Sequence, residues 1–188
     1  MPPARRAVPA TAARVAATVV IQVWPLLALL GALTAAAGGW WSASGDPVPA
    51  QMFGRLTAVV ILGLLGSFVV HELAHLLALR RIASVDQVWL ERTGWRISLH
   101  PCGLMSPRQI AAVAVAGPGA CVLVGLGLGV LLPGSTLRWW YLAHVLALVP
   151  PLGDGRALVT AARSSRRAAL APQPTCNTPR GMLWRGTR

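Results

Sequence analysis

The sequence carries little charge. Asp, Glu, Lys and Arg make up 12% of its 188 residues, whereas an ordinary soluble domain has about 25%. The hydrophobic share is 55%, and the mean hydropathy is +0.59. This composition excludes an ordinary soluble domain and indicates a membrane protein of one domain.

Lysine is absent, and the net charge of +12 arises from 17 arginines set against five acidic residues. A charge of this size can indicate a nucleic-acid-binding protein. Here, however, the arginines are concentrated outside the long apolar runs, as basic residues that flank membrane spans are. We therefore expect the lipid bilayer, and no nucleic acid, as a partner.

Cysteine is scarce as well. Cys102, Cys121 and Cys176 are too few and too scattered for a disulfide framework. Nothing in the sequence requires a disulfide bond.

Four apolar runs are present instead, at residues 15–37, 56–79, 110–132 and 137–162. A transmembrane helix needs about 20 apolar residues, so the sequence predicts an all-α polytopic membrane protein with four transmembrane helices. The first run could alternatively be a signal peptide, because Arg5, Arg6 and Arg14 precede it. Its length exceeds the usual apolar run of a signal peptide, about 7–15 residues, which favours a retained span.

The arginines predict the orientation. They cluster before the first span, between the second and third spans, and after the fourth. The positive-inside rule then places both termini and the loop of residues 81–109 in the cytoplasm. Since the lysine-free, Ala-, Arg- and Gly-rich composition suits a GC-rich bacterial genome, we expect a bacterial plasma membrane protein.

The segments outside the spans differ in character. Residues 1–14 form a basic N-terminal segment, and the basic, proline-containing residues 163–188 predict a disordered cytoplasmic tail. In the loop, residues 85–91 and 95–100 have strand-like composition around Arg92-Thr93-Gly94, which predicts a short β-hairpin. Trp89 and Trp95 would be interfacial anchors. An irregular loop is the alternative.

Two of the five acidic residues, Glu72 and Asp154, fall inside predicted spans. A charge at bilayer depth costs several kcal/mol on most estimates, so such residues usually mark function. Glu72 belongs to the segment HELAH, in which His71 and His75 are four residues apart and share one helix face. HExxH is the pattern of zinc hydrolases. A helix whose polar face pairs with other helices is the alternative.

A catalytic zinc usually has three protein ligands and one water. Asp154 is the candidate for the third ligand, because Pro150 and Pro151 must break the fourth span beside it. Irregular backbone at membrane depth occurs where it lines protein or a wet cavity. The alternative partner for Asp154 is Arg156, but residues two apart on a helix do not face each other.

The depth of these residues in the membrane tests the ligand assignment without using the HExxH motif. His71 and His75 precede Arg80 by nine and five residues, and Asp154 precedes Arg163 by nine. At about 1.5 Å per residue, both lie about 8–14 Å inside the cytoplasmic boundary. The Gly117-Pro118-Gly119 segment of the third span lies at a similar level. His144 would lie about 15 Å along the helix from Asp154, so we expect it to have a packing or hydrogen-bonding role.

HELAH in one span, AGPGA in a later one and PPLGDG near the end resemble the site-2 protease family of intramembrane zinc metalloproteases. The resemblance covers residues 54–162 and implies a three-span catalytic core, with the first span as an addition. It implies His71, His75 and Asp154 as ligands of one Zn²⁺ per chain and Glu72 as the general base. It further implies a transmembrane protein substrate, held in part by the loop hairpin. Without a PDZ or CBS domain, the chain would be a minimal member.

The sequence departs from the family pattern at two places. Cys121 stands where the glycine-proline motif usually ends in asparagine, and Gly153 precedes the aspartate where leucine is common. Gly117, Pro118 and Cys121 are therefore the candidates for positioning substrate. An inactive metal-binding scaffold or chaperone of the same fold is the second hypothesis, supported by Cys121. A metal transporter is the third, and it would need further intramembrane ligands, for which His144 is the only spare histidine.

Overall fold

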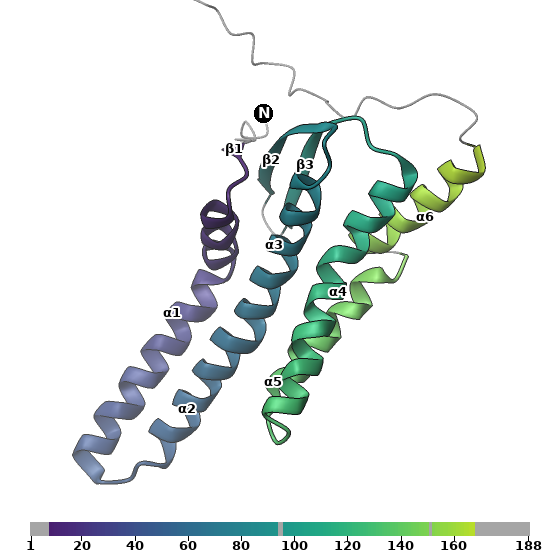
Figure 1. Ribbon diagram of the computed structural model, residues 1–188. Helices are drawn as coiled ribbons and strands as arrows, with labels where there is room; N and C mark the ends of the chain where they lie inside the picture. Colours follow the sequence, from purple (N-terminus) through teal and green to yellow (C-terminus); the bar gives the residue numbers. More distant parts are fainter. Residues whose placement is uncertain (1–7, 94–95, 151, 168–188) are drawn as a thin grey trace, which may run out of the picture.

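The computed structural model describes residues 8–93, 96–150 and 152–167. Long helices run side by side, and a small sheet lies at one end of them, where the described chain both begins and ends (Figure 1). The described elements, in chain order, are β1 (Val8–Pro9), α1 (Ala12–Ser44), α2 (Val48–Val59), η1 (Val60–Leu65), α3 (Gly66–Arg80), β2 (Val85–Thr93), β3 (Arg96–Gly103), α4 (Pro107–Leu131), α5 (Leu137–Leu142), η2 (Ala143–Leu148) and α6 (Gly153–Arg167).

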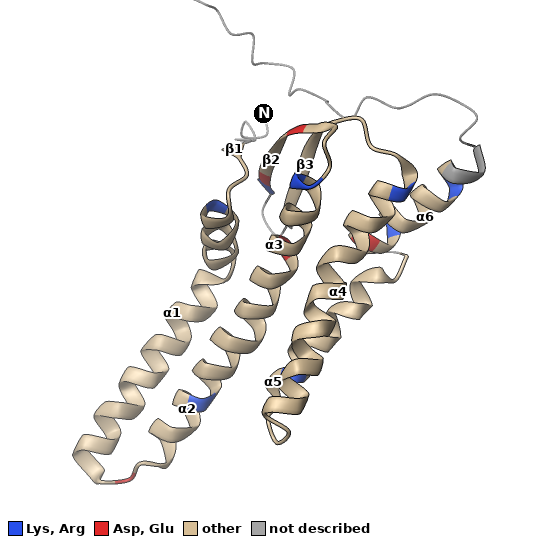
Figure 2. Ribbon diagram, in the orientation of Figure 1, with Lys and Arg blue, Asp and Glu red and all other residues tan. Residues whose placement is uncertain are grey.

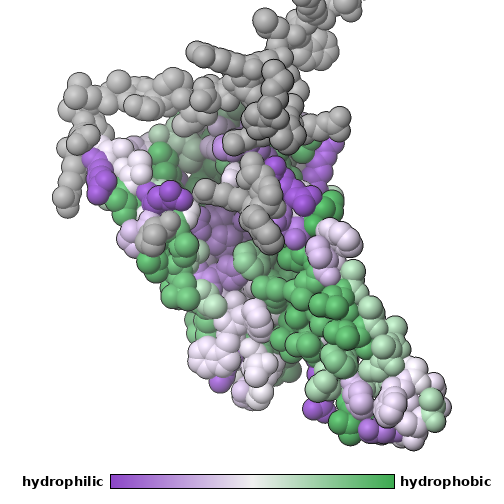
Figure 3. All heavy atoms as spheres, turned by 180° about the vertical axis from the view of Figure 1, so that it is seen from behind, coloured by the Kyte–Doolittle hydropathy of each residue, from purple (hydrophilic) through white to green (hydrophobic). Residues whose placement is uncertain are grey.

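Four helical stretches are long and apolar enough to cross a membrane, namely Ala12–Ser44, Val48–Arg80, Pro107–Leu131 and Leu137–Ser164. This confirms the prediction of four such helices, with the first two longer than the apolar runs. Among the described residues, charged positions gather toward the sheet end, and most of the length of the long helices carries none (Figure 2). Seen from behind, apolar residues cover much of the helices (Figure 3). Large side chains such as Leu123, Val130 and Leu131 are 72–81% exposed.

Local sequence signals explain where the helices begin and end. The Thr11 hydroxyl accepts a hydrogen bond from the Arg14 amide at the start of α1, and Gly45 ends that helix with φ 75°, a left-handed conformation that favours glycine. Ser106 and Gln109 form a capping box at the start of α4. Pro118 lies inside α4 without interrupting it.

The second stretch is one continuous helix, Val48–Arg80, with a π-helical segment, η1, in its middle. Segments of this kind often occur near functional sites. The Tyr141 hydroxyl of α5 donates a hydrogen bond to the Leu62 carbonyl of η1, at 2.9 Å. A β-carbon on Gly63 would lie 2.7 Å from the Trp140 ring, so glycine permits this close approach of α5.

The fourth stretch is interrupted where its prolines predict. After α5 the chain tightens into the 3₁₀ helix η2, becomes extended at Val149 and starts α6 at Gly153. Helix α6 continues to Arg167, so residues 163–167 are helical and not part of a disordered tail. The rest of the predicted tail, residues 168–188, lies outside the described residues.

The loop of residues 81–109 contains the predicted hairpin, and the irregular-loop alternative is wrong. Strands β2 and β3 pair antiparallel, with a register shift between Val85 and Gln87. The chain is not purely α-helical, however, because β1 pairs with β2 and makes a sheet of order β1-β2-β3. Part of the predicted N-terminal segment is therefore built into the fold. Trp89 is half-buried, and Trp95 lies outside the described residues.

A cluster of buried apolar side chains joins the sheet to the end of α3. Its members come from the segment just before α1 and from α1, α3 and β2, namely Ala10, Val15, Leu76, Leu79, Val88 and Leu90. Ile97 and Leu99 of β3 and Val113 of α4 pack against it. The hairpin is thereby fixed next to the turns of α3 that carry HELAH.

Candidate metal centre

The two histidines of HELAH lie side by side on one face of α3, as their spacing predicts. Their Nε2 atoms are 3.0 Å apart. Both residues are buried, with 7% and 8% of their surface exposed. Two imidazole nitrogens at this separation, deep between helices, form one side of a potential metal site.

Asp154 completes the group from the first turn of α6. Its Oδ2 atom lies 3.2 Å from His71 Nε2, and its Oδ1 atom lies 3.4 Å from His75 Nε2. The interrupted fourth stretch makes this possible, because α6 restarts at Gly153 with Asp154 facing α3. Both carboxylate oxygens face histidines, as expected for the ligand role and not for an Asp154–Arg156 pair.

These distances fit a zinc ion. Nitrogen and oxygen ligands about 2.0–2.1 Å from zinc, at tetrahedral angles, are about 3.3 Å apart. The three separations found here, 3.0, 3.2 and 3.4 Å, scatter closely around that value. Two imidazoles and one carboxylate are also a donor set of catalytic zinc sites. The group is thus close enough and chemically suited to hold a metal ion.

A hydrogen bond from α3 to α4 fixes the orientation of His75. Its Nδ1 atom lies 2.7 Å from the Val113 carbonyl oxygen. A carbonyl only accepts, so Nδ1 carries the proton and Nε2 keeps its lone pair for a metal. A backbone acceptor behind a ligand histidine is the usual outer support of a metal site.

The Gly117-Pro118 segment of α4 lies against this group, as depth matching predicted. A β-carbon on Gly117 would lie 2.4 Å from His75 Nε2, so only glycine leaves room for the imidazole. Pro118 is fully buried beside it. Cys121, one turn further along α4, is also fully buried, and its thiol donates to the Ser67 carbonyl at 3.3 Å.

A cavity of about 390 Å³ opens beside the three ligand candidates, and Glu72 lines it together with them. Its volume lies in the usual range for ligand sites, about 300–1,000 Å³. The remaining wall includes Leu79 of α3 and Met105, which precedes α4. The other lining residues come from three further elements: β3 with Ile97, Ser98, Leu99 and Pro101, α4 with Ile110, Val113 and Ala114, and α6 with Gly153 and Ala157. Cys121 is not among the residues that line it.

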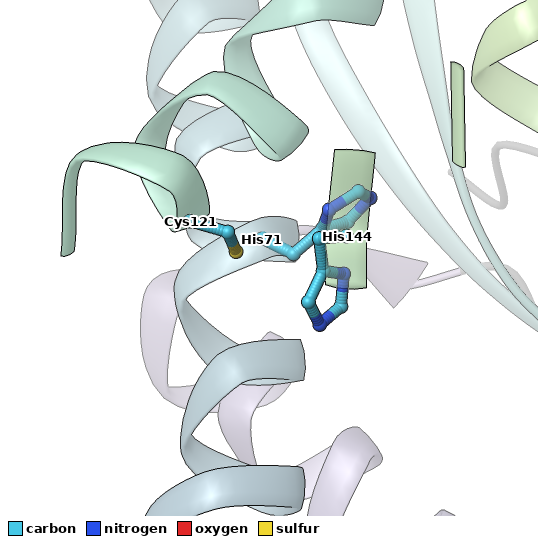
Figure 4. A group of neighbouring side chains, drawn as sticks. All are labelled: His71, Cys121 and His144. Carbon is cyan, nitrogen blue, oxygen red and sulfur yellow. The ribbon is translucent and has the colours of Figure 1, made fainter. Parts of the chain in front are cut away.

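The distance of His144 from the site that was predicted from the sequence is too large. The estimate of about 15 Å assumed a continuous helix, but the chain forms the 3₁₀ helix η2 at Ala143–Leu148 and is extended at Val149. The ring centre of His144 lies 4.8 Å from that of His71 and 4.9 Å from that of Phe68 (Figure 4). The expected packing role is confirmed by the Phe68 contact. Pro150-Pro151 was the signal that a uniform helical rise does not apply here.

Comparisons of the chain with protein-family models, with curated proteins and with solved structures find no match.

Proposed function

We propose that this protein is an integral membrane zinc metalloprotease resembling the site-2 protease family. The convergence of His71, His75 and Asp154 from two separate helices carries the proposal, with separations of 3.0–3.4 Å between their ligand atoms. Glu72 on the wall of the adjoining cavity supports a hydrolytic site over a purely structural one.

His71, His75 and Asp154 would hold one zinc ion, which lowers the pKa of a bound water to about 7. The Glu72 carboxylate takes the proton of the attacking water and passes it to the leaving amine of the peptide bond. Glu72 lines the same cavity as the three ligand candidates, so the general base and the metal site are next to each other. The Val113 carbonyl holds the imidazole of His75 in place throughout.

The substrate would be a transmembrane segment that unwinds before cleavage, since a helix hides its own carbonyl groups in hydrogen bonds. Strand β3 lies at the edge of the sheet and lines the cavity with Ile97, Ser98 and Leu99. An extended segment bound beside this edge would bring its backbone close to Glu72. The four apolar helices would span the plasma membrane of a bacterium, with the sheet end in the cytoplasm.

Proteolysis of a transmembrane substrate in proteoliposomes tests the proposal. Glu72→Gln should abolish cleavage while the zinc content stays at the wild-type value, and Asp154→Ala should lower the zinc content. Glu91→Gln and Asp86→Asn change acidic residues of β2 and serve as matched controls that retain both properties. Full cleavage by Glu72→Gln, or an unchanged zinc content in Asp154→Ala, would refute the mechanism.

An inactive metal-binding scaffold or chaperone is the second candidate, and Cys121 favours it. Its thiol bonds to Ser67 in the helix interface and does not line the cavity. It therefore cannot replace an asparagine amide that contacts substrate. One zinc per chain without turnover, across a broad panel of transmembrane substrates, would support the scaffold and contradict the protease.

A further inference from the structure

A second group of ligand-type side chains lies directly behind the first. His71, Cys121 and His144 come from α3, α4 and η2, and each offers one ligand atom within 4.8 Å of the other two. Figure 4 shows the three side chains gathered on one side of α3. Cys121 is fully buried and His144 is half-buried. The proposed protease chemistry uses neither Cys121 nor His144.

His71 belongs to both groups and has two ring nitrogens. Its Nε2 atom faces His75 and Asp154. Its Nδ1 atom is buried and has no hydrogen-bond partner among the described residues. The whole side chain is only 9% exposed to solvent. A buried polar atom without a partner costs about 1–3 kcal/mol of folding free energy. A metal ion bound to this nitrogen would offset that cost.

We propose that Cys121, His144 and Nδ1 of His71 form a second metal position, which takes a thiophilic divalent ion such as Zn²⁺, Cd²⁺ or Co²⁺. The imidazole of His71 would then bridge two ions. Cys121 binds as the thiolate and gives up its hydrogen bond to Ser67, while His71 binds as the imidazolate. The thiol proton and the remaining N–H proton of the His71 ring both leave to solvent. The inference goes beyond the proposed function, with which it shares only His71.

The donor set distinguishes the two positions. Two imidazoles and a carboxylate lie beside an open cavity in the first, whereas the second has a sulfur ligand that does not line that cavity. Thiolate ligands favour soft and borderline ions. With Zn–S near 2.3 Å and Zn–N near 2.0–2.1 Å, the ligand atoms of an occupied site lie about 3.3–3.6 Å apart. The present limit is 4.8 Å, so binding would draw the Cys121 and His144 side chains closer to His71.

Cobalt titration of the full chain, purified in detergent and stripped of metal, tests the second position. A cobalt–thiolate bond produces a charge-transfer band in the near ultraviolet, which nitrogen and oxygen ligands do not. Wild type should bind two Co²⁺ per chain, with the band rising on the second equivalent. Cys121→Ser should lose the band and bind one, and His144→Gln should behave similarly. Cys102→Ser is the matched control and should keep both.

The outcomes distinguish a failure of the second metal position from a failure of the proposed protease mechanism. One Co²⁺ per wild-type chain without a charge-transfer band at excess cobalt would overturn the second position, and so would a band that persists in Cys121→Ser. In Asp154→Ala, the second position predicts a single Co²⁺ with the band intact. Two Co²⁺ bound to Asp154→Ala would be consistent with the second position. It would contradict the role of Asp154 as a zinc ligand in the proposed protease.

Discussion

Gly117 and His75 lie so close that a single added carbon would separate them. A β-carbon at residue 117 would be 2.4 Å from His75 Nε2 and 2.8 Å from two ring carbons. The Val113 carbonyl, also of α4, holds Nδ1 of the same imidazole, which opposes a movement of the ring away from α4. Helix α4 therefore contacts both ring nitrogens of His75.

Gly117→Ala should weaken zinc binding. The methyl group must displace the imidazole, and disturbing the support of a metal ligand typically costs 10–100-fold in affinity. We expect zinc affinity to fall by about tenfold or more, measured by competition with a chelating dye. Gly127→Ala is the control, since a β-carbon on Gly127 of the same helix meets nothing within 4 Å. Equal affinities for the two variants would contradict the contact.

Gly155 has a similar role for Asp154. A β-carbon there would lie 2.2 Å from the Val149 carbonyl oxygen and 2.5 Å from that of Leu148, both backbone atoms that cannot rotate away. Gly155→Ala should therefore open the bend before α6 and move Asp154 off the histidines.

Overpacking of this kind costs about 1–3 kcal/mol, which in a chain of this size lowers Tm by about 2–12 °C. Thermal unfolding in detergent measures the change, and zinc content should fall with it. Gly134→Ala, in the loop between α4 and α5, meets nothing within 4 Å and should leave both unaltered. A Gly155→Ala protein with wild-type Tm and zinc content would show that the bend is not needed.

The grouping of His71, His75 and Asp154 could be predicted from the sequence, because each step depends on local geometry. The spacing of His71 and His75 places them on one helix face, and counting residues from flanking arginines places Asp154 at their depth. The hydrogen bond from His75 to Val113 could not be predicted, since it depends on how α4 packs against α3. Likewise, the proximity of His144 depends on the path of a broken helix.

Strand β1 was missed for a different reason. It consists of Val8 and Pro9, and two residues are too few to show a strand-like alternation. Its pairing with Trp89 and Leu90 is a long-range contact that only the folded hairpin creates. Proline is tolerated there because β1 is an edge strand, in which one side of the backbone needs no partner.

The hydrogen bond from Tyr141 to Leu62 should stabilise the π-helical segment that precedes HELAH. Tyr141→Phe removes the donor and leaves the carbonyl without it, at a cost of about 1 kcal/mol. We expect a decrease in Tm of about 2–4 °C. The matched control is Thr18→Val, which deletes an exposed hydroxyl bonded within α1 and should change Tm little. A larger decrease in Thr18→Val than in Tyr141→Phe would contradict this role.

The predicted orientation determines on which side of the membrane three connecting segments lie. Ser84 lies between α3 and β2 at the sheet end, whereas Asp46 and Gly134 lie in the α1–α2 and α4–α5 connections at the opposite end (Figure 1). Arginines cluster on the sheet side, including Arg80, Arg81 and Arg108. Because basic loops stay in the cytoplasm, the sheet end should face inward.

Single cysteines introduced at these three positions, in a chain without its native cysteines, test this orientation in intact cells. A maleimide that does not cross membranes should label Asp46→Cys and Gly134→Cys directly, and Ser84→Cys only after the cells are permeabilised. The reverse pattern would place the metal centre near the outer face, where the substrate would have to be cleaved from outside. Labelling of all three without permeabilisation would mean that the helices do not span the membrane.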